Sequence, residues 1–156
     1  MPRKKFARVL SLGLLEHCAD AERVLSEGYR VLRPGGVLRT RTVNRYTLLA
    51  EPHVGVWGVG FVPRRWADRY VRWRAGARDL FHRPLSACEL RSALRRAGFG
   101  RVSTEAAVLL PSESARLGPA ASRAGALYTA ARRVAIFRSA LTAIAPLLEA
   151  GGVKAG

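Results

Sequence analysis

The chain has 156 residues, 49% of them hydrophobic, which is enough for one folded domain and excludes a largely disordered protein. Its 27 Lys and Arg residues outnumber 11 Asp and Glu residues, and the resulting net charge of +16 favours anionic partners such as nucleic acid or an acidic lipid surface. The basic residues are nearly all Arg, are spread through the whole chain and come with many Ala and Gly. A compositional bias of the source genome explains the charge as well, and we favour that explanation.

The two cysteines, Cys18 and Cys88, have no C-x-x-C spacing, and no secretory signal precedes them. A reduced, cytoplasmic setting is therefore expected for both thiols. The chain also has no uninterrupted apolar run of the roughly 18 to 20 residues that a membrane-spanning helix needs. We expect a cytoplasmic protein whose contact with a membrane, if it has one, is peripheral.

In chain order, the first elements form a strand, a helix and a second strand. Residues 9–12 are a short apolar run, Asp20 begins a helical pattern, Pro34-Gly35-Gly36 ends it, and residues 37–43 are rich in β-branched side chains. A βαβ unit places the loops that follow its two parallel strands at the same edge of the sheet, where ligands bind. Residues 13–19 and the residues from Asn44 onward are thus predicted to lie side by side.

The second strand carries two arginines, Arg39 and Arg41, which alternate onto one face. A central strand of a doubly wound sheet is normally apolar on both faces, and burying two unpaired guanidinium groups costs several kcal/mol. The pattern leaves three possibilities: this face is uncovered, acidic side chains reach it, or the fold is weakened.

Four short motifs in this region resemble class I S-adenosylmethionine-dependent methyltransferases: LEH after the first strand, DAERVL at the helix start, YRVLRPGGVL, and N-R-Y after the second strand. The resemblance covers residues 8–46 well and residues 85–110 more loosely. It implies an α/β fold with part of a Rossmann-like methyltransferase sheet, equivalent to strands four to six, and S-adenosylmethionine as the cofactor.

In that family the cofactor lies on a Gly-rich turn after the first strand, and an acidic residue at the end of the second strand holds its ribose. Here the matching region begins a few residues after Met1, so neither feature is expected in this sequence. The resemblance therefore implies the carboxyl-terminal half of such a domain, truncated and inactive by itself.

Residues 44–84 lose regular periodicity and are rich in Trp, Tyr, Phe and Arg. Long non-periodic segments in compact domains are usually binding loops, and in the resembled family this region contributes to the acceptor pocket. Within it, residues 63–74 fit a short helix with Trp66, Tyr70 and Trp73 on one face. We expect that aromatic stripe to pack within the protein.

Residues 85–97 resume helical spacing, with Ser86 as the N-cap and Gly98 as the stop, and residues 99–110 fit a strand. A Ser-, Gly- and Pro-containing linker is predicted over 111–119. A long amphipathic helix follows, ended or kinked at Pro146, and its apolar positions are Leu127, Ala130, Val134, Phe137, Leu141, Ile144 and Leu148.

The predicted organisation is a methyltransferase half-domain over residues 1–110, with an acceptor-side insertion at 44–84, and a linker with an amphipathic helix over 111–156. Flanking arginines would let this helix lie on an anionic membrane, although packing on the domain or on a partner is the commoner use of such a face. Val153 and Lys154 fit the remnant of a last strand, but residues 148–156 are too rich in glycine to be assigned.

The candidate catalytic residues are His17, as a proton acceptor, and Glu16, which would orient it. The alternative is a polar pair that only holds the loop. The resemblance places Leu14 and Leu15 beside the cofactor. The predicted acceptor contacts are Asn44, Arg45, Tyr46, His53 and Trp57.

We expect no metal site. Some relatives hold Mg²⁺ with an E-x-x-E-H sequence and a distant histidine, but Gly13 stands where the first Glu would be. A site of Glu16, His17 and His53 would lack a carboxylate that Mg²⁺ favours. His82 has no evident partner in the sequence.

Two functions follow. The first is methyl transfer from S-adenosylmethionine to a small or lipid-linked hydroxylated acceptor, a reaction that needs aligned reactants and removal of a proton. The alternative is a non-catalytic basic module that binds nucleic acid or an anionic membrane. Nucleic acid is the less favoured partner, because the arginines alternate with aromatic residues only in residues 63–74.

Overall fold

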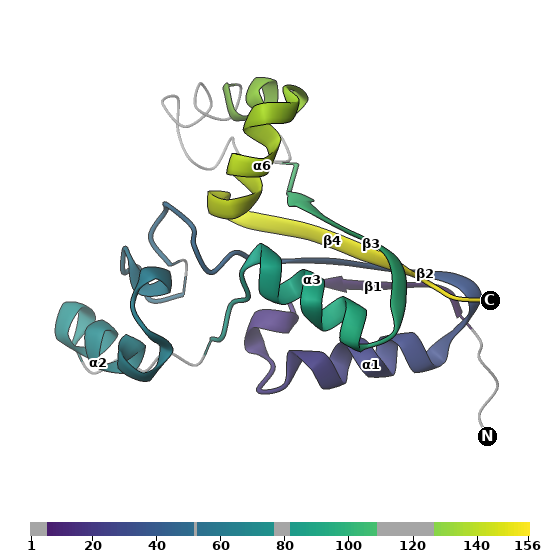
Figure 1. Cartoon of the computed structure of the whole chain (residues 1–156). Coiled ribbons are helices and arrows are strands. Elements are labelled where there is room, and N and C mark those ends of the chain that lie inside the picture. The colour runs from purple at the N-terminus through teal and green to yellow at the C-terminus, as the bar shows by residue number, and fades with distance from the viewer. Residues whose placement is uncertain (1–5, 52, 77–81, 109–126) are drawn as a thin grey trace.

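The computed structural model describes residues 6–51, 53–76, 82–108 and 127–156, and its centre is a four-stranded sheet with strand order β1-β2-β4-β3 (Figure 1). The strands are β1 (Phe6–Leu12), β2 (Leu32–Val43), β3 (Phe99–Ala106) and β4 (Leu147–Lys154). β1 and β2 are parallel, as predicted, whereas β4 is antiparallel to both of its neighbours. This mixed α/β sheet fits the predicted partial Rossmann-like fold.

Helices α1 (Ala21–Val31) and α3 (Ala87–Arg96) lie together on one face of the sheet (Figure 1). Between them and the strands lies the main core, whose large side chains, among them Leu25, Leu38, Leu90, Leu94 and Leu148, are almost completely buried. Burying a leucine side chain contributes about 1.5 to 3 kcal/mol, so this layer supplies much of the stability.

The caps of both helices follow the sequence prediction. Asp20 accepts a hydrogen bond from the backbone N–H of Arg23 at 2.9 Å. Ser86 and Glu89 form a reciprocal capping box at the start of α3, and Gly98 follows with a φ of +97°. Helix α1 ends at Val31, and the predicted turn at residues 34–36 is instead a bulge within β2.

The other face of the sheet is open over β1, where Leu10 and Leu12 are 68% and 69% exposed. Arg39 is exposed on this face. Arg41 is partly covered, donates a hydrogen bond to the carbonyl of Val108 at 3.0 Å and lies 4.0 Å from the carboxylate of Glu149. Two of the three possibilities raised by the sequence therefore hold: the face is uncovered, and an acidic partner reaches Arg41.

The insertion between β2 and α3 has some structure of its own. It contains the short helix η2 (Val59–Phe61) and helix α2 (Arg64–Ala75), with a small core of Val54, Val56, Val59, Ala67 and Val71. The prediction that the aromatic stripe of α2 packs inside is wrong for Trp66 and Trp73, which are 59% and 75% exposed. The small side chains of Ala67 and Val71 form the buried face instead, so the indoles point outward.

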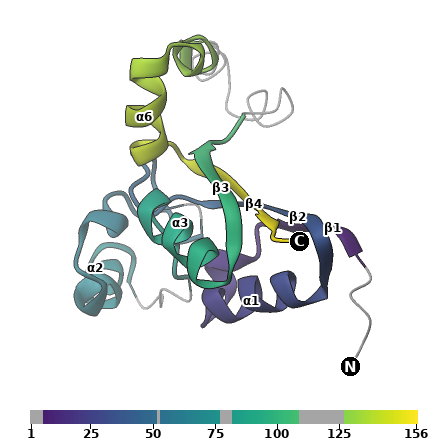
Figure 2. The same ribbon diagram turned by 45° about the vertical axis from the view of Figure 1, so that its right-hand side comes forward.

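The predicted long carboxyl-terminal helix is interrupted. Residues 127–133 are helical, Val134 is extended with φ −94° and ψ 122°, and α6 (Ala135–Ile144) follows (Figure 2). The helix ends just before Pro146, as expected. The predicted linker at 111–119 and the last residues of the predicted strand, 109–110, lie outside the described residues.

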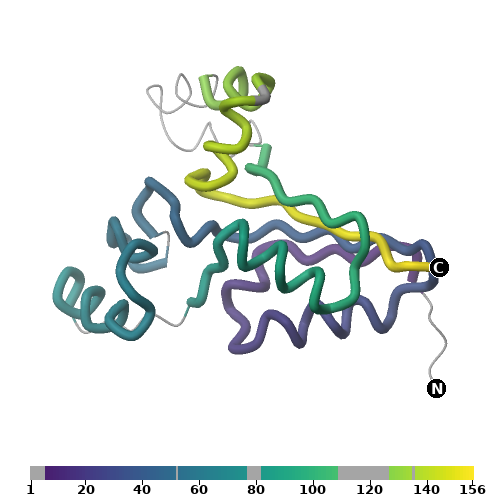
Figure 3. Tube along the Cα trace, viewed as in Figure 1, coloured from purple at the N-terminus to yellow at the C-terminus, as the bar shows by residue number. Residues whose placement is uncertain are grey.

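The unassigned glycine-rich stretch forms β4, which sits between β2 and β3 (Figure 3). The segment expected to hold only a linker and a helix thus also supplies a strand of the central sheet. In the part of the chain that the structure describes, every helix is too short or too polar to cross a bilayer.

Candidate functional site

The loops that follow β1 and β2 lie at the same edge of the sheet. The backbone N–H of Gly13, just after β1, donates to the carbonyl of Arg41 at 2.9 Å, and the two strands pair in parallel up to Leu12 and Arg41. The short helix η1 (Leu15–His17) begins two residues after Gly13. The predicted neighbourhood of the two loops is therefore present.

Three predicted site residues in η1 and just before it have different environments. Leu14 is 46% exposed, whereas the side chain of Leu15 is completely buried in the main core. Glu16 is also buried, and its carboxylate accepts a hydrogen bond from the hydroxyl of Thr42 at 2.6 Å. Glu16 thus connects the loop to β2 through Thr42.

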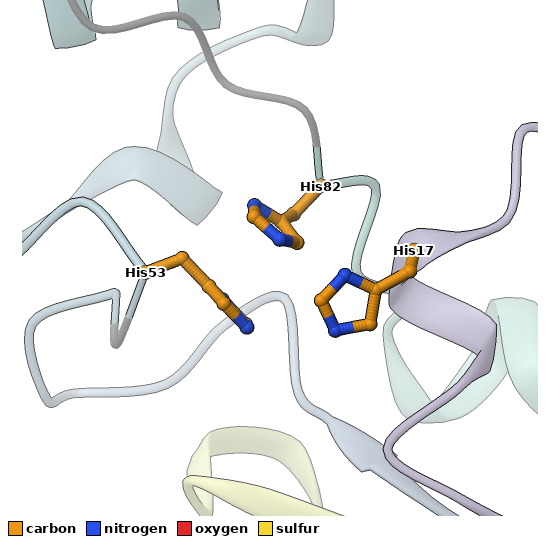
Figure 4. Close-up of side chains that lie close together, drawn as sticks. All are labelled: His17, His53 and His82. Atoms are coloured by element: carbon orange, nitrogen blue, oxygen red, sulfur yellow. The ribbon is translucent and has the colours of Figure 1, made fainter.

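All three histidines of the chain gather beside this loop, and we call His17, His53 and His82 the imidazole cluster (Figure 4). They come from η1, from the insertion and from the segment that leads into α3. The ring centroids of His53 and His82 are stacked 3.6 Å apart, and the ring of His17 meets them edge-on at 5.0 and 4.5 Å. His17 and His53, both predicted site residues, are thus brought together.

Glu51 orients one member of the cluster. Its Oε1 lies 2.6 Å from Nδ1 of His53, and its other oxygen accepts hydrogen bonds from the backbone N–H groups of His53 and Val54 at 2.8 and 2.9 Å. Glu51 is also buried, with 5% of its surface exposed, and the two backbone hydrogen bonds fix its carboxylate in the loop. A carboxylate on Nδ1 favours the tautomer that leaves Nε2 of His53 as the free lone pair.

The third member, His82, is the most enclosed of the cluster. Burial lowers its pKa below the usual value of 6.5, and the nearby imidazoles of His53 and His17 lower it further. His82 is therefore neutral at neutral pH. Its Nδ1 atom is buried and makes no hydrogen bond within the described residues.

The backbone of Glu16 links η1 to the third segment, because its carbonyl accepts a hydrogen bond from the N–H of Arg83 at 2.8 Å. This bond holds the segment carrying His82 against the loop that follows β1. The cluster is thus supported by backbone contacts of its own elements.

The predicted acceptor contacts after β2 are largely engaged in the structure. Asn44 is fully buried and donates to the carbonyl of Ala143 at 3.0 Å, so it joins the end of β2 to α6. Arg45 donates to the carbonyl of Gly60 at 3.1 Å. Tyr46 packs against Phe61, and Trp57 is 58% exposed with its indole N–H on the carbonyl of Leu48.

A hollow of about 820 Å³ lies between α3, β3 and α6 and reaches Tyr46. Its lining is mixed, with more apolar than polar surface, and its polar side chains include Arg91, Arg138, Thr104 and Thr142. The hydroxyl of Thr104 is buried without a hydrogen-bond partner among the described residues. The hollow can therefore take a molecule with hydroxyl or anionic groups.

Sequence reasoning missed the roles of Glu51 and His82. No local spacing such as H-x₃-H marks the cluster, because its members come from three separate segments. The chain has only three histidines, and two of them, His17 and His53, lie in loops predicted to form the site. This was the only indication in the sequence that His82 joins them.

A family model described as a methyltransferase domain matches residues 1–40, which include β1, η1, α1 and the first part of β2. A search of curated proteins found no match.

Solved structures similar to this chain include a possible histamine N-methyltransferase from Thermotoga maritima. It is 19% identical, with a TM-score of 0.51, and the match covers 97% of this chain and 57% of that one.

A second is phosphoethanolamine N-methyltransferase 2 from Haemonchus contortus, solved with phosphomonomethylethanolamine and S-adenosylhomocysteine. It is 18% identical, with a TM-score of 0.53, and the match covers 98% of this chain and 34% of that one.

An S-adenosylmethionine-dependent methyltransferase from Mesorhizobium loti is 18% identical, with a TM-score of 0.53 over 99% of this chain and 64% of that one. This chain therefore spans about a third to two thirds of the length of these structures. At such low identities the likeness concerns the fold.

Proposed function

We propose that this chain, which carries part of a class I S-adenosylmethionine-dependent methyltransferase domain, supplies the acceptor side of a methyl-transfer site. The observation that supports this function best is the parallel pairing of β1 and β2, which brings His17 and the loop after Asn44 to one edge of the sheet. Ligands of α/β folds bind at the carboxyl ends of such strands.

In this proposal the acceptor is a small or lipid-linked molecule with a hydroxyl group. The cofactor supplies an electrophilic methyl group when bound. With the cofactor bound, His17 would accept the proton of the acceptor hydroxyl, and the methyl group would pass from the sulfonium to that oxygen with release of S-adenosylhomocysteine. Glu16 acts through the loop, because its carboxylate is already bonded to Thr42.

Of the two predicted cofactor contacts, Leu14 fits the role better, since its side chain is exposed beside the loop and that of Leu15 lies in the core. The hollow beside Tyr46 would hold the body of the acceptor in this proposal, since its arginines and hydroxyls suit a hydroxylated or phosphorylated molecule, whereas His17 lies outside its lining.

The chain alone is expected to bind S-adenosylmethionine poorly. The turn after β1 carries the single glycine Gly13 followed by two leucines, and the exposed strand β1 lies at the edge of the described sheet. Calorimetric titration of the 156-residue chain with S-adenosylmethionine should therefore show no binding in the micromolar range. Micromolar binding would contradict this part of the proposal.

If the reading frame extends upstream of Met1, methyl transfer is to be assayed with the longer protein that it encodes. Translation upstream of the Met1 codon should reveal a strand followed by a Gly-rich turn, and the longer protein should convert S-adenosylmethionine to S-adenosylhomocysteine when given the right hydroxylated acceptor. His17→Ala should lower kcat by roughly 10²- to 10⁴-fold. Full activity of that variant would remove His17 from the reaction.

A second candidate function is peripheral binding to an anionic membrane. It is favoured by the exposure of Ile136 and Phe137 on α6, 78% and 54%, together with the exposed Arg133 and Arg138 and the net charge of +16. Such contact is also compatible with a lipid-linked acceptor.

A further inference from the structure

The imidazole cluster has the composition of a metal centre. We propose that His17, His53 and His82 bind one divalent first-row transition-metal cation, with Zn²⁺ as the favoured ion. The evidence for this site does not rest on the proposed methyl transfer, but the two share His17, and an ion bound to that imidazole nitrogen would occupy the lone pair that accepts a proton.

The distances allow coordination after small side-chain rotations. One ring nitrogen of each histidine lies within 4.8 Å of the corresponding nitrogens of the other two. Zinc bonds of about 2.0 to 2.1 Å in tetrahedral geometry place neighbouring nitrogens roughly 3.4 Å apart. His17 is exposed, so its ring can turn toward the ion, whereas the ring of His53 is held by Glu51 through Nδ1. Figure 4 shows the three rings side by side.

The stacked pair also has to separate slightly. The rings of His53 and His82 lie almost parallel, with an interplanar angle of 16°, and stacked rings cannot direct both lone pairs at one point. Because Glu51 holds both the backbone N–H and Nδ1 of His53, the separation has to keep the Nδ1 contact while Nε2 turns toward the ion.

The surroundings of the cluster supply the usual outer partner of a metal ligand. A histidine that binds a metal through one nitrogen almost always gives its other N–H to a carboxylate or a carbonyl. Glu51 makes this contact with Nδ1 of His53 at 2.6 Å, and the carboxylate is itself buried and fixed by two backbone N–H groups. The tautomer is thereby set before any metal arrives.

His82 gives a second, independent indication. Its Nδ1 is buried and has no hydrogen-bond partner among the described residues, and leaving a buried polar atom without a partner costs free energy. Bound through this atom, a cation would satisfy it.

The donor set selects the metal. Three imidazole nitrogens suit Zn²⁺, Co²⁺, Ni²⁺ or Cu²⁺, whereas Mg²⁺ prefers oxygen ligands. Glu16, the carboxylate nearest in sequence to His17, is already bonded to Thr42. The site therefore differs from a magnesium site of Glu16, His17 and His53, which the sequence argues against. Three protein ligands leave a fourth position open to water.

The first test uses Co²⁺ as a spectroscopic probe on the full chain with Cys88→Ala, which removes an exposed thiol that would compete for the ion. Stoichiometric Co²⁺ should produce the visible absorption of a four-coordinate nitrogen site, and one equivalent of Zn²⁺ should abolish it. Because the chain has only three histidines, all three imidazole spin systems in an NMR spectrum should shift with Zn²⁺.

Variants separate the cluster from adventitious binding. His17→Gln, His53→Gln and His82→Gln should each weaken Zn²⁺ binding by more than 100-fold, and Glu51→Gln by about 10- to 100-fold. Cys88→Ala should leave the affinity of the chain unchanged, and a large excess of Mg²⁺ should not displace Zn²⁺. Circular dichroism checks that each variant is folded.

The spectra of the Cys88→Ala chain, which keeps all three histidines, decide the matter even if a histidine variant does not fold. Absence of Co²⁺ bands, a shift of fewer than three imidazole systems, displacement by Mg²⁺, or unchanged affinity in a folded histidine variant would each overturn the proposal. Loss of methyl transfer with intact Zn²⁺ binding would instead count only against the proposed function.

Discussion

At the scale of single residues, Lys154 shows how one side chain can join two elements. This lysine at the end of β4 is 5% exposed, and its Nζ donates to the carbonyls of Tyr29 and Leu32 at 2.5 and 2.9 Å. The ammonium also lies 4.4 Å from the centre of the Tyr29 ring. It therefore satisfies the last carbonyls of α1, where a positive charge is favoured.

We expect Lys154→Met to lower the free energy of unfolding by about 1 to 3 kcal/mol, because the buried carbonyls lose charged hydrogen-bond donors. Thermal or urea unfolding followed by circular dichroism measures this. Arg95→Met, which removes an exposed cation from α3, is the matched control and should change stability by less than about 0.5 kcal/mol. Equal effects of the two changes would refute the capping role of Lys154.

At the scale of elements, the start of α3 depends on Glu89. Burial alone would raise the pKa of this carboxyl group, but hydrogen bonds from the backbone N–H of Ser86, from Arg64 and from the Ser86 hydroxyl outweigh burial and hold the pKa below its usual value. The ionised form is therefore the one that stabilises the fold. Its contribution is complete above the unfolded-state pKa of about 4.3 and is lost as the pH falls through the lower folded-state value.

Glu89→Gln should accordingly lower the Tm at neutral pH, and the difference from the wild-type chain should shrink below about pH 4. Because the side chain is 37% exposed, solvent screens the ion pairs and we expect less than about 1 kcal/mol from them. Asp68→Asn, on the exposed face of α2, controls for the loss of one negative charge. A Tm difference that is constant with pH would contradict this account.

Strand β4 also depends on two glycines. A Cβ atom at Gly151 would lie 2.7 Å from the carbonyl oxygen of Leu38, and one at Gly152 would lie 2.6 Å from Cβ of Phe99. The strand can pass between β2 and β3 only because these side chains are missing.

Gly151→Ala should therefore destabilise the protein by about 1 to 3 kcal/mol, since the crowding atom belongs to the backbone and cannot rotate away. Denaturant unfolding measures the loss. Gly35→Asn is a useful comparison, because Gly35 has open space around it and asparagine tolerates its φ of +71°. A neutral Gly151→Ala would mean that β4 is packed less tightly than described.

At the scale of the whole molecule, helices α1 and α3 cover one face of the sheet in the described part of the chain (Figure 2). On the other face β1 exposes Leu10 and Leu12, and α6 exposes Ile136 and Phe137. With a net charge of +16, these surfaces favour association with an anionic layer.

The full chain should therefore sediment with vesicles of mixed anionic and zwitterionic lipid at low salt, and less so as salt rises, because Debye screening shortens the electrostatic attraction. Replacing both Ile136 and Phe137 by Asp should reduce the bound fraction several-fold. Replacing both Leu48 and Leu49 by Asp adds the same two charges at exposed positions of the insertion and is the control for a general change in charge. If α6 makes no contact with the membrane, the two variants will behave alike.

The sequence alone determined the elements that depend on local patterns. The apolar run of β1, the Asp20 cap of α1, the capping box of α3 and the parallel pairing of β1 with β2 all follow from short motifs and from the rule that a helix links parallel strands. These elements are specified by residues that are close together in the sequence.

Tertiary structure decided the rest, because the interactions concerned join residues far apart in the chain. The glycine-rich composition of β4, which prevented its assignment from the sequence, is required because the backbone of β2 and the side chain of Phe99 leave no room for a Cβ atom at Gly151 and Gly152. The exposure of Trp66 and Trp73 follows from which side of α2 meets the small core of the insertion. The contact of His82 with His17 and His53 depends on the packing of three separate segments near the carboxyl end of β1, and no residue spacing in the sequence predicts this contact.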